Sequence, residues 1–88
     1  MRKSKKERIA ELFDMPKEVM LDLPKLTVYN DNQLTVENYS GILQYTAEYI
    51  RLKTTGKAIG ISGNGLELRT ITDIDVLIEG EINKIEYI

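Results

Sequence analysis

The chain has 88 residues, which allow one domain with a single modest core. It contains no Cys and no His, which excludes disulfides, thiolate metal sites and histidine-based acid–base catalysis. The net charge of −2 is unevenly spread, because residues 2–8 hold five basic side chains and one acidic, whereas residues 67–88 hold six acidic and two basic.

The front of the chain, residues 4–14, is predicted to form a short helix. Ser4 and Glu7 have the S-x-x-E spacing of a capping box. One apolar stripe follows at helical spacing, formed by Ile9, Leu12 and Phe13. A helix of this length is marginal in water by itself and needs a surface to pack on. Residues 1–24 are therefore expected to form a basic helix and a linker.

Residues 25–88 are predicted to form an all-β domain, because apolar and polar residues alternate there as in half-buried strands. Apolar positions recur every eight residues, at Leu26, Leu34, Ile42, Ile50, Ala58, Leu66, Ile74 and Ile82. A short strand plus a tight turn accounts for this spacing. We therefore expect about eight short antiparallel strands in a meander, folded into a small sandwich or open barrel.

Turn-forming residues separate these predicted strands. They are Asp31-Asn32, Asn38 to Gly41, Thr46 to Glu48, Thr55-Gly56, Gly63-Asn64-Gly65, Thr72-Asp73 and Gly80-Glu81. The glycine-rich segment 63–65 predicts a tight reversal and so favours hairpins. A β-solenoid-like stack stays open as the alternative, because short repeated strands can also stack in coils.

The basic start is the first candidate for a binding role. Positive charges near a helix N-terminus oppose the helix dipole and so do not help the helix form, which adds weight to a binding role, while a merely solvated helix start stays open as the other interpretation. They suit an anionic membrane surface or an acidic partner. Nucleic acid is not expected, because the rest of the chain is acidic and lacks basic–aromatic strands. The candidate partner- or membrane-binding residues are Arg2, Lys3, Lys5, Lys6, Arg8, Ile9, Leu12 and Phe13.

No residue pattern indicates catalysis or a bound group. The carboxylates of the last strands lack the spacing of a calcium loop, and segment 63–65 lacks the lysine and following helix of a phosphate-binding loop. We therefore expect no enzyme activity, no cofactor, no metal and no small-molecule substrate. Without an apolar run long enough for a membrane span or a signal peptide, the chain is expected in the cytoplasm.

The strand edges give a second hypothesis. A row of short strands leaves unpaired N–H and C=O groups at its edges unless it closes. The last strand runs to Ile88, and an unprotected edge there is expected to invite strand addition by a partner or by another copy. A self-assembling structural protein that polymerises through such edges is therefore the alternative to a domain that binds a separate partner.

The order of the segments also carries a resemblance. After the basic start come M-P-K-E-V at 15–19 and L-D-L-P-K-L-T at 21–27. Later segments are Glu37-Asn38 with Gly41-Ile42, Tyr45 to Ile50, Ile59 to Leu68, and I-E-G-E-I at 78–82 with I-E-Y at 85–87. In this order the chain resembles the YabP/YqfC family of sporulation proteins of endospore-forming Firmicutes, and is closer to the YqfC branch.

The resemblance implies a non-enzymatic adaptor or assembly factor that acts in the mother cell during spore envelope formation. It also implies a partnership with the membrane protein YqfD, which is usually encoded alongside. We therefore expect the chain in the mother-cell cytoplasm, peripheral at the membrane that faces the forespore, with homo-oligomers left open. The resemblance supplies no functional residues that carry over to this sequence.

Overall fold

The computed structural model describes residues 23–88, which form six β-strands and contain no helix. The strands are β1 (Lys25–Tyr29), β2 (Gln33–Glu37), β3 (Tyr39–Tyr45), β4 (Tyr49–Thr54), β5 (Ile59–Ile71) and β6 (Asp75–Tyr87). The predicted all-β class is confirmed. The predicted helix at residues 4–14 lies outside the described residues, so the division at residue 24 remains a prediction.

All six strands belong to one antiparallel sheet with the order β1-β2-β6-β5-β4-β3. The strands from β3 to β6 follow one another as a meander, as predicted. The β1–β2 hairpin then adds to β6, which lies far from it in the sequence. Antiparallel pairing throughout residues 23–88 rules out the solenoid alternative, whose stacked strands run parallel.

The prediction of about eight short strands is wrong in number. The predicted turns at Gly63-Asn64-Gly65 and Gly80-Glu81 lie inside β5 and β6, which are each 13 residues long. Each of these long strands replaces two predicted short ones. Glycines at these positions therefore mark a bend in two paired strands and not a chain reversal.

The bend requires glycine because the two backbones come very close there. A Cβ atom on Gly63 would overlap the carbonyl oxygen of Glu81, a clash that no side chain tolerates. Gly80 has φ +138°, and a Cβ there would lie 2.6 Å from the Gly65 carbonyl oxygen. The pairing of β5 with β6 also shifts register around these residues. Such bulges bend a pair of strands without ending their pairing.

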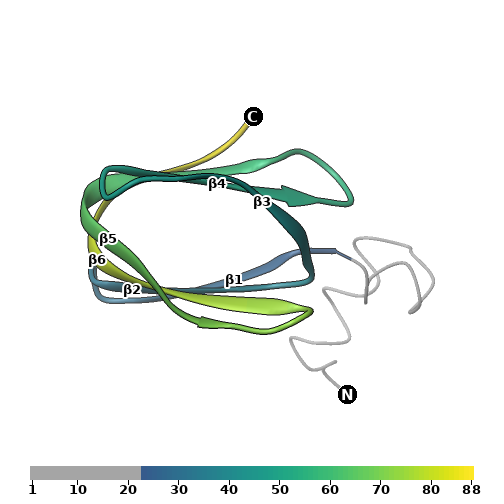
Figure 1. The fold of residues 1–88 in the computed structure, drawn as a ribbon, viewed down its shortest axis with the longest axis horizontal. Coiled ribbons are helices and arrows are strands. Elements are labelled where there is room, and N and C mark those ends of the chain that lie inside the picture. Colours follow the sequence, from purple (N-terminus) through teal and green to yellow (C-terminus); the bar gives the residue numbers. More distant parts are fainter. Residues whose placement is uncertain (1–22) are drawn as a thin grey trace, which may run out of the picture.

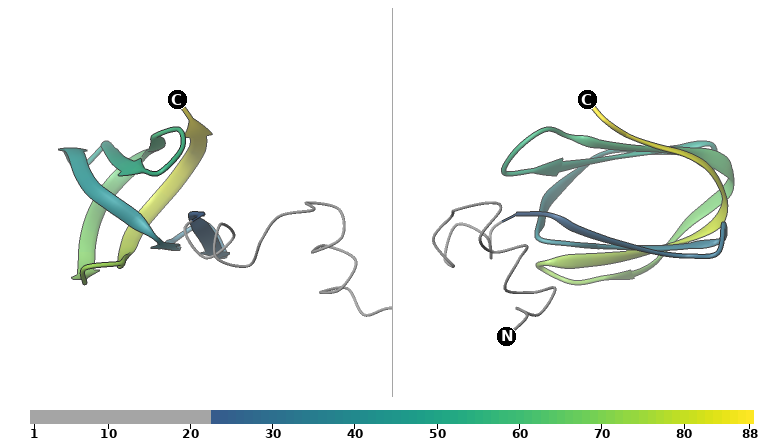
Figure 2. Two further views of the ribbon diagram at one scale, coloured as in Figure 1. Left: turned by 90° about the vertical axis from the view of Figure 1, so that its right-hand side faces the viewer. Right: turned by 180° about the vertical axis from the view of Figure 1, so that it is seen from behind.

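The bend folds the single sheet into two facing layers, which surround the core (Figure 1). One layer holds β1, β2 and the hairpin between β5 and β6, and the other holds β3, β4 and the remaining halves of β5 and β6 (Figures 1 and 2). The buried apolar side chains are Leu34, Val36, Ile50, Leu52, Ile59, Ile61, Leu66, Val76 and Ile78. They come from β2, β4, β5 and β6, so the two outermost strands, β1 and β3, contribute no fully buried apolar residue.

Threonine stabilises two of the turns that the sequence predicted correctly. The Thr46 Oγ1 accepts hydrogen bonds from the N–H groups of Glu48 (3.3 Å) and Tyr49 (2.9 Å). The Thr72 Oγ1 accepts equivalent bonds from Ile74 (3.3 Å) and Asp75 (3.0 Å). Both turns are thus closed by local side-chain bonds. Ile74 lies in the second turn and is exposed, contrary to its predicted place in a strand.

Candidate functional site

The residues predicted to bind a partner or membrane, Arg2, Lys3, Lys5, Lys6, Arg8, Ile9, Leu12 and Phe13, all lie outside residues 23–88. Within the described part, no group of three His, Cys, Asp or Glu side chains is placed to hold a metal ion. No helix in that part is long and apolar enough to cross a membrane. The exposed features of the described part are the surfaces and edges of the sheet.

The edge strand β3 has the most unusual surface. It is the one strand of the described six without a charged residue, and most of its residues are exposed. Two register shifts against β4 leave Ser40 and Leu43 without a partner on that strand. These bulges change the side-chain period from two to three, so Tyr39, Ile42 and Tyr45 lie opposite Thr54, Leu52 and Ile50. The three β4 residues are buried, so the three β3 residues face the core side.

The second half of β5 lies across from β3 and presents a matching apolar row. Leu68 and Ile71 pair with Ile78 and Val76 of β6, which are buried, so both face the core side as well. Ile71 is nevertheless 55% exposed, because no strand of the described chain pairs with this half of β5 on its other edge. We call the surface formed by Tyr39, Ile42, Tyr45, Leu68 and Ile71 the β3–β5 seam.

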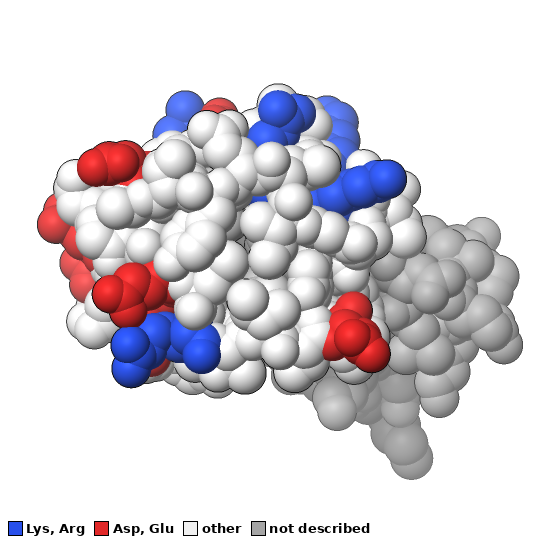
Figure 3. Space-filling view, viewed as in Figure 1, with Lys and Arg blue, Asp and Glu red and all other residues white. Residues whose placement is uncertain are grey.

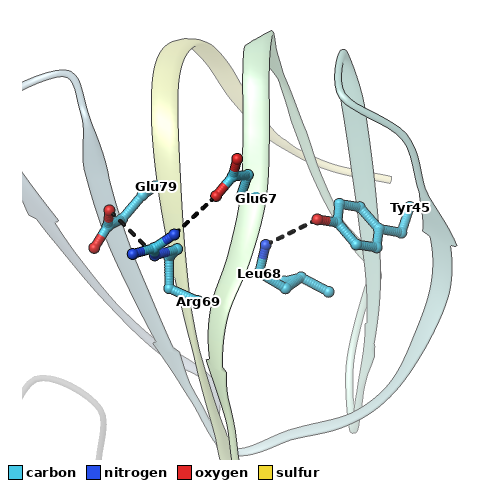
Figure 4. A network of polar contacts seen from close by, with 5 residues as sticks. All are labelled: Tyr45, Glu67, Leu68, Arg69 and Glu79. Atoms are coloured by element: carbon cyan, nitrogen blue, oxygen red, sulfur yellow. Dashed lines mark hydrogen bonds and ion pairs between the residues drawn. The ribbon is translucent and has the colours of Figure 1, made fainter.

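Two tyrosine hydroxyls connect the sides of the seam. The Leu68 N–H donates a hydrogen bond to the Tyr45 hydroxyl oxygen (3.1 Å), as Figure 4 shows. The Tyr39 hydroxyl donates to the Thr72 carbonyl oxygen (2.6 Å) at the tip of the β5–β6 hairpin. Near the bend, the Leu66 N–H donates to the Ala47 carbonyl oxygen (2.8 Å). Side chains and a turn thus satisfy backbone groups that a further strand would otherwise pair.

Charged side chains lie around the seam and not within it. Arg69 contacts Glu67 (3.1 Å) and Glu79 (3.6 Å) on the side of β5 away from Tyr45 (Figure 4). The face seen in Figure 3, with β3 and the β5–β6 hairpin toward the viewer, has its charges at the margin and an uncharged centre. Ile42 is 40% and Tyr45 50% exposed there. An exposed apolar surface with a polar rim is typical of a protein-binding site.

Sequence reasoning missed this seam. The readable signal was the lack of charge in Tyr39–Tyr45, because edge strands are usually protected by charged side chains. Strict alternation would have placed Gly41 and Leu43 on the core side in place of Ile42. Only the bulges reveal which residues share a face.

These features define a small all-β protein with exposed strand edges and a partly exposed apolar seam. Sequence comparison gives its family: the sequence model of the YabP family matches residues 22–88, and the chain belongs to that family. The predicted YabP/YqfC resemblance is thus confirmed. The matched region coincides with the described sheet and excludes the basic start.

One relative comes from Bacillus subtilis (strain 168), where it is described as uncharacterized protein YqfC. It is 28% identical to this chain over 80 residues, which cover 91% of this chain and 86% of the relative. No solved structure gives a significant match.

Proposed function

We propose that this chain is a non-enzymatic adaptor or assembly factor of sporulation, which acts in the mother cell with a membrane partner during spore envelope formation. Its place is the cytoplasmic face of the membrane that faces the forespore. The membrane protein YqfD, implied by the family resemblance, is the proposed partner. Membership of the YabP family supports the link to sporulation.

The uncharged, partly exposed β3–β5 seam is the observation that carries the adaptor role. Exposing a group of apolar side chains to water costs free energy, and on a small domain such a group marks an interaction site. The basic start, residues 2–13, supplies a second contact of different chemistry, which suits the anionic membrane surface beside such a partner. The seam then gives specificity for the partner, and the basic start adds electrostatic attraction to the membrane surface.

Membrane fractionation of sporulating cells tests the role. The full-length chain is compared with a version that starts at Met15, each with and without YqfD. We expect the full-length chain in the membrane fraction only when YqfD is present, and we expect truncation to release it. If both versions stay soluble in every strain, the adaptor proposal is wrong.

Substitution in the β3–β5 seam separates the contribution of β3 to partner binding from that of the basic start. Ile42 belongs to the seam and is 40% exposed, so Ile42→Asp places a charge directly on the seam. We expect this variant to lose co-purification with YqfD. Tyr29→Asp on β1, at the opposite edge of the sheet, is the matched control and should keep it. Equal retention by both variants would exclude the seam as the contact.

A self-assembling structural protein is the second candidate. The sheet ends in two different outer strands, β1 and β3. Pairing of β1 from one copy with β3 from the next would be head-to-tail and would build an open filament. Sizing chromatography with light scattering distinguishes the candidates: a mass that keeps rising with concentration supports the filament, and a constant mass supports the adaptor.

A further inference from the structure

The second half of β6 has an edge that the described chain leaves uncovered. β2 pairs with β6 only between Asp75 and Glu79, whereas β5 pairs with β6 along its whole length. Beyond the bend, the Ile82 N–H donates to the Asp31 carbonyl oxygen (2.8 Å) from the β1–β2 turn. Within residues 23–88, no strand pairs with this edge of residues 83–87, which run along the rear side of the molecule (Figure 2, right).

The two faces of this segment differ in chemistry. Ile85 and Tyr87 pair with the buried residues Ile61 and Ile59, so both lie on the core-facing side. Tyr87 is still 61% exposed because nothing in the described chain lies beyond the edge. On the outer face, Lys84 and Glu86 form an ion pair at 3.2 Å.

The segment is self-complementary when it is paired antiparallel with itself about Ile85. In that register Lys84 of one copy lies opposite Glu86 of the other, and the same pair occurs again across the two-fold axis. Ile85 then lies opposite Ile85, and Asn83 opposite Tyr87. Opposite charges and apolar side chains directly across a pair of strands both stabilise the pairing, by about 0.2–1 kcal/mol for each pair.

We propose that two copies of this chain form a two-fold symmetric dimer by antiparallel pairing of residues 83–87 of β6, with Ile85 on the axis. The pairing joins the two sheets into one continuous sheet and satisfies the outward N–H and C=O groups of this edge. It also covers Tyr87 and doubles the number of Lys84–Glu86 contacts.

The other edges are less suited to pairing with themselves. Two bulges distort β3, and bulges are a usual means of blocking edge-to-edge pairing. The strand β1 is regular, but pairing about its central Thr27 brings Lys25 opposite Tyr29, with no charge complement. In β6 a bulge against β5 leaves Asn83 unpaired at one end of the segment, but residues 84–86, which include Ile85 and both matching charges, keep a regular register.

The dimer does not depend on the proposed role in sporulation. A two-fold contact uses the same edge of both copies and therefore closes. It predicts a limiting mass of two chains, in contrast to the open filament of the self-assembling alternative. The β3–β5 seam, which lies on the other side of the molecule, stays available to a partner.

Charge reversal of the full-length chain tests the register. Lys84→Glu places two carboxylates opposite each other at both symmetric contacts, and Glu86→Lys places two ammonium groups opposite each other there. We expect the unchanged chain to be a dimer in sedimentation velocity, and each variant to dissociate with a dimerisation Kd raised at least about tenfold. An equimolar mixture of the two variants should restore a one-to-one dimer, because each carboxylate then meets an ammonium group.

Both variants keep a like-charge pair within their own strand. Recovery of the dimer in the mixture would therefore come from contacts between copies and not from contacts within one chain. The double variant Lys84→Glu with Glu86→Lys should also dimerise. Lys25→Glu, a reversal on β1, is the matched control and should leave the mass unchanged. A monomeric unchanged chain, dimers of both single variants, or a mixture that stays monomeric would each overturn the proposal.

Discussion

The second halves of β5 and β6 each have one edge that no strand of the described chain covers, and the two edges differ in how their backbone groups are bonded. Each long strand pairs with the other throughout, but β4 covers only the first half of β5 and β2 only the first half of β6. The uncovered half of β5 is bridged by Tyr45 and by the turn that follows β3. The corresponding half of β6 receives a bond from the β1–β2 turn at its start and nothing from the described chain along residues 83–87.

The difference shows how one bent sheet produces two kinds of surface. On the β5 side, the Leu66 and Leu68 N–H groups are already bonded, and an apolar seam remains for a partner's side chains. Where the edge stays open, the backbone itself can pair with another strand. The two surfaces therefore suit different partners, and the predictions below test their difference.

The largest effect is expected at the bend that creates both surfaces. Gly63→Ala forces a Cβ atom against the Glu81 carbonyl oxygen, so β6 must move away from β5. We expect the free energy of unfolding in urea to fall by about 3 kcal/mol. Gly41→Ala in β3 is the control, because its nearest contact would be the Lys53 Cβ at 3.9 Å, and should change stability by less than about 0.5 kcal/mol. Equal losses would show that the bend is not the constraint.

An intermediate effect is expected at the closed half of β5. Tyr45→Phe removes the acceptor of the Leu68 N–H, which should lower stability by about 1 kcal/mol and speed hydrogen exchange of the Leu68 amide. Tyr87→Phe makes the same change on the open half of β6, where the tyrosine is highly exposed, and should leave stability within about 0.5 kcal/mol. Unchanged exchange at Leu68 in Tyr45→Phe would contradict the bridging role.

The smallest effect is expected at the charged side of β5. Arg69 lies between Glu67 and Glu79, which are opposite each other in the strand register. Arg69→Ala leaves two carboxylates facing each other and should cost about 0.5 kcal/mol at low salt. The loss should shrink in 1 M NaCl, where charges are screened within roughly 3 Å. Lys25→Ala, which breaks a 3.8 Å exposed pair with Glu37, is the control and should cost less at both salt concentrations. A loss that does not depend on salt would point to packing of the Arg69 stem instead.

Much of the local structure could be predicted from the sequence. The turns at Asp31-Asn32, Thr46–Glu48, Thr55-Gly56 and Thr72-Asp73 lie between strands as expected. Their chemistry is local: the Thr46 and Thr72 side chains bond to nearby backbone groups, and Asn30 enters the first turn with φ +54°. Such bonds form in the same way regardless of the tertiary structure of the rest of the chain.

The bends and the seam could not be predicted in the same way. A glycine-rich segment such as 63–65 suits both a reversal and a bent strand, and the choice depends on whether β6 stays paired beyond it. The seam depends on the bulges at Ser40 and Leu43, which arise from fitting seven residues of β3 to fewer on β4. The predicted site at residues 2–13 remains a prediction.

The sequence by itself determined that residues 25–88 form antiparallel strands, because alternation and turn chemistry act between near neighbours. It also carried the resemblance to the YabP/YqfC family. The tertiary structure decided which strands merge, which edge is bridged by tyrosine and which stays open. These features depend on pairings between residues far apart in the chain, such as Leu34 with Ile78 and Leu68 with Tyr45. The pattern near each residue does not fix such pairings, because they form only once distant segments of the chain have met.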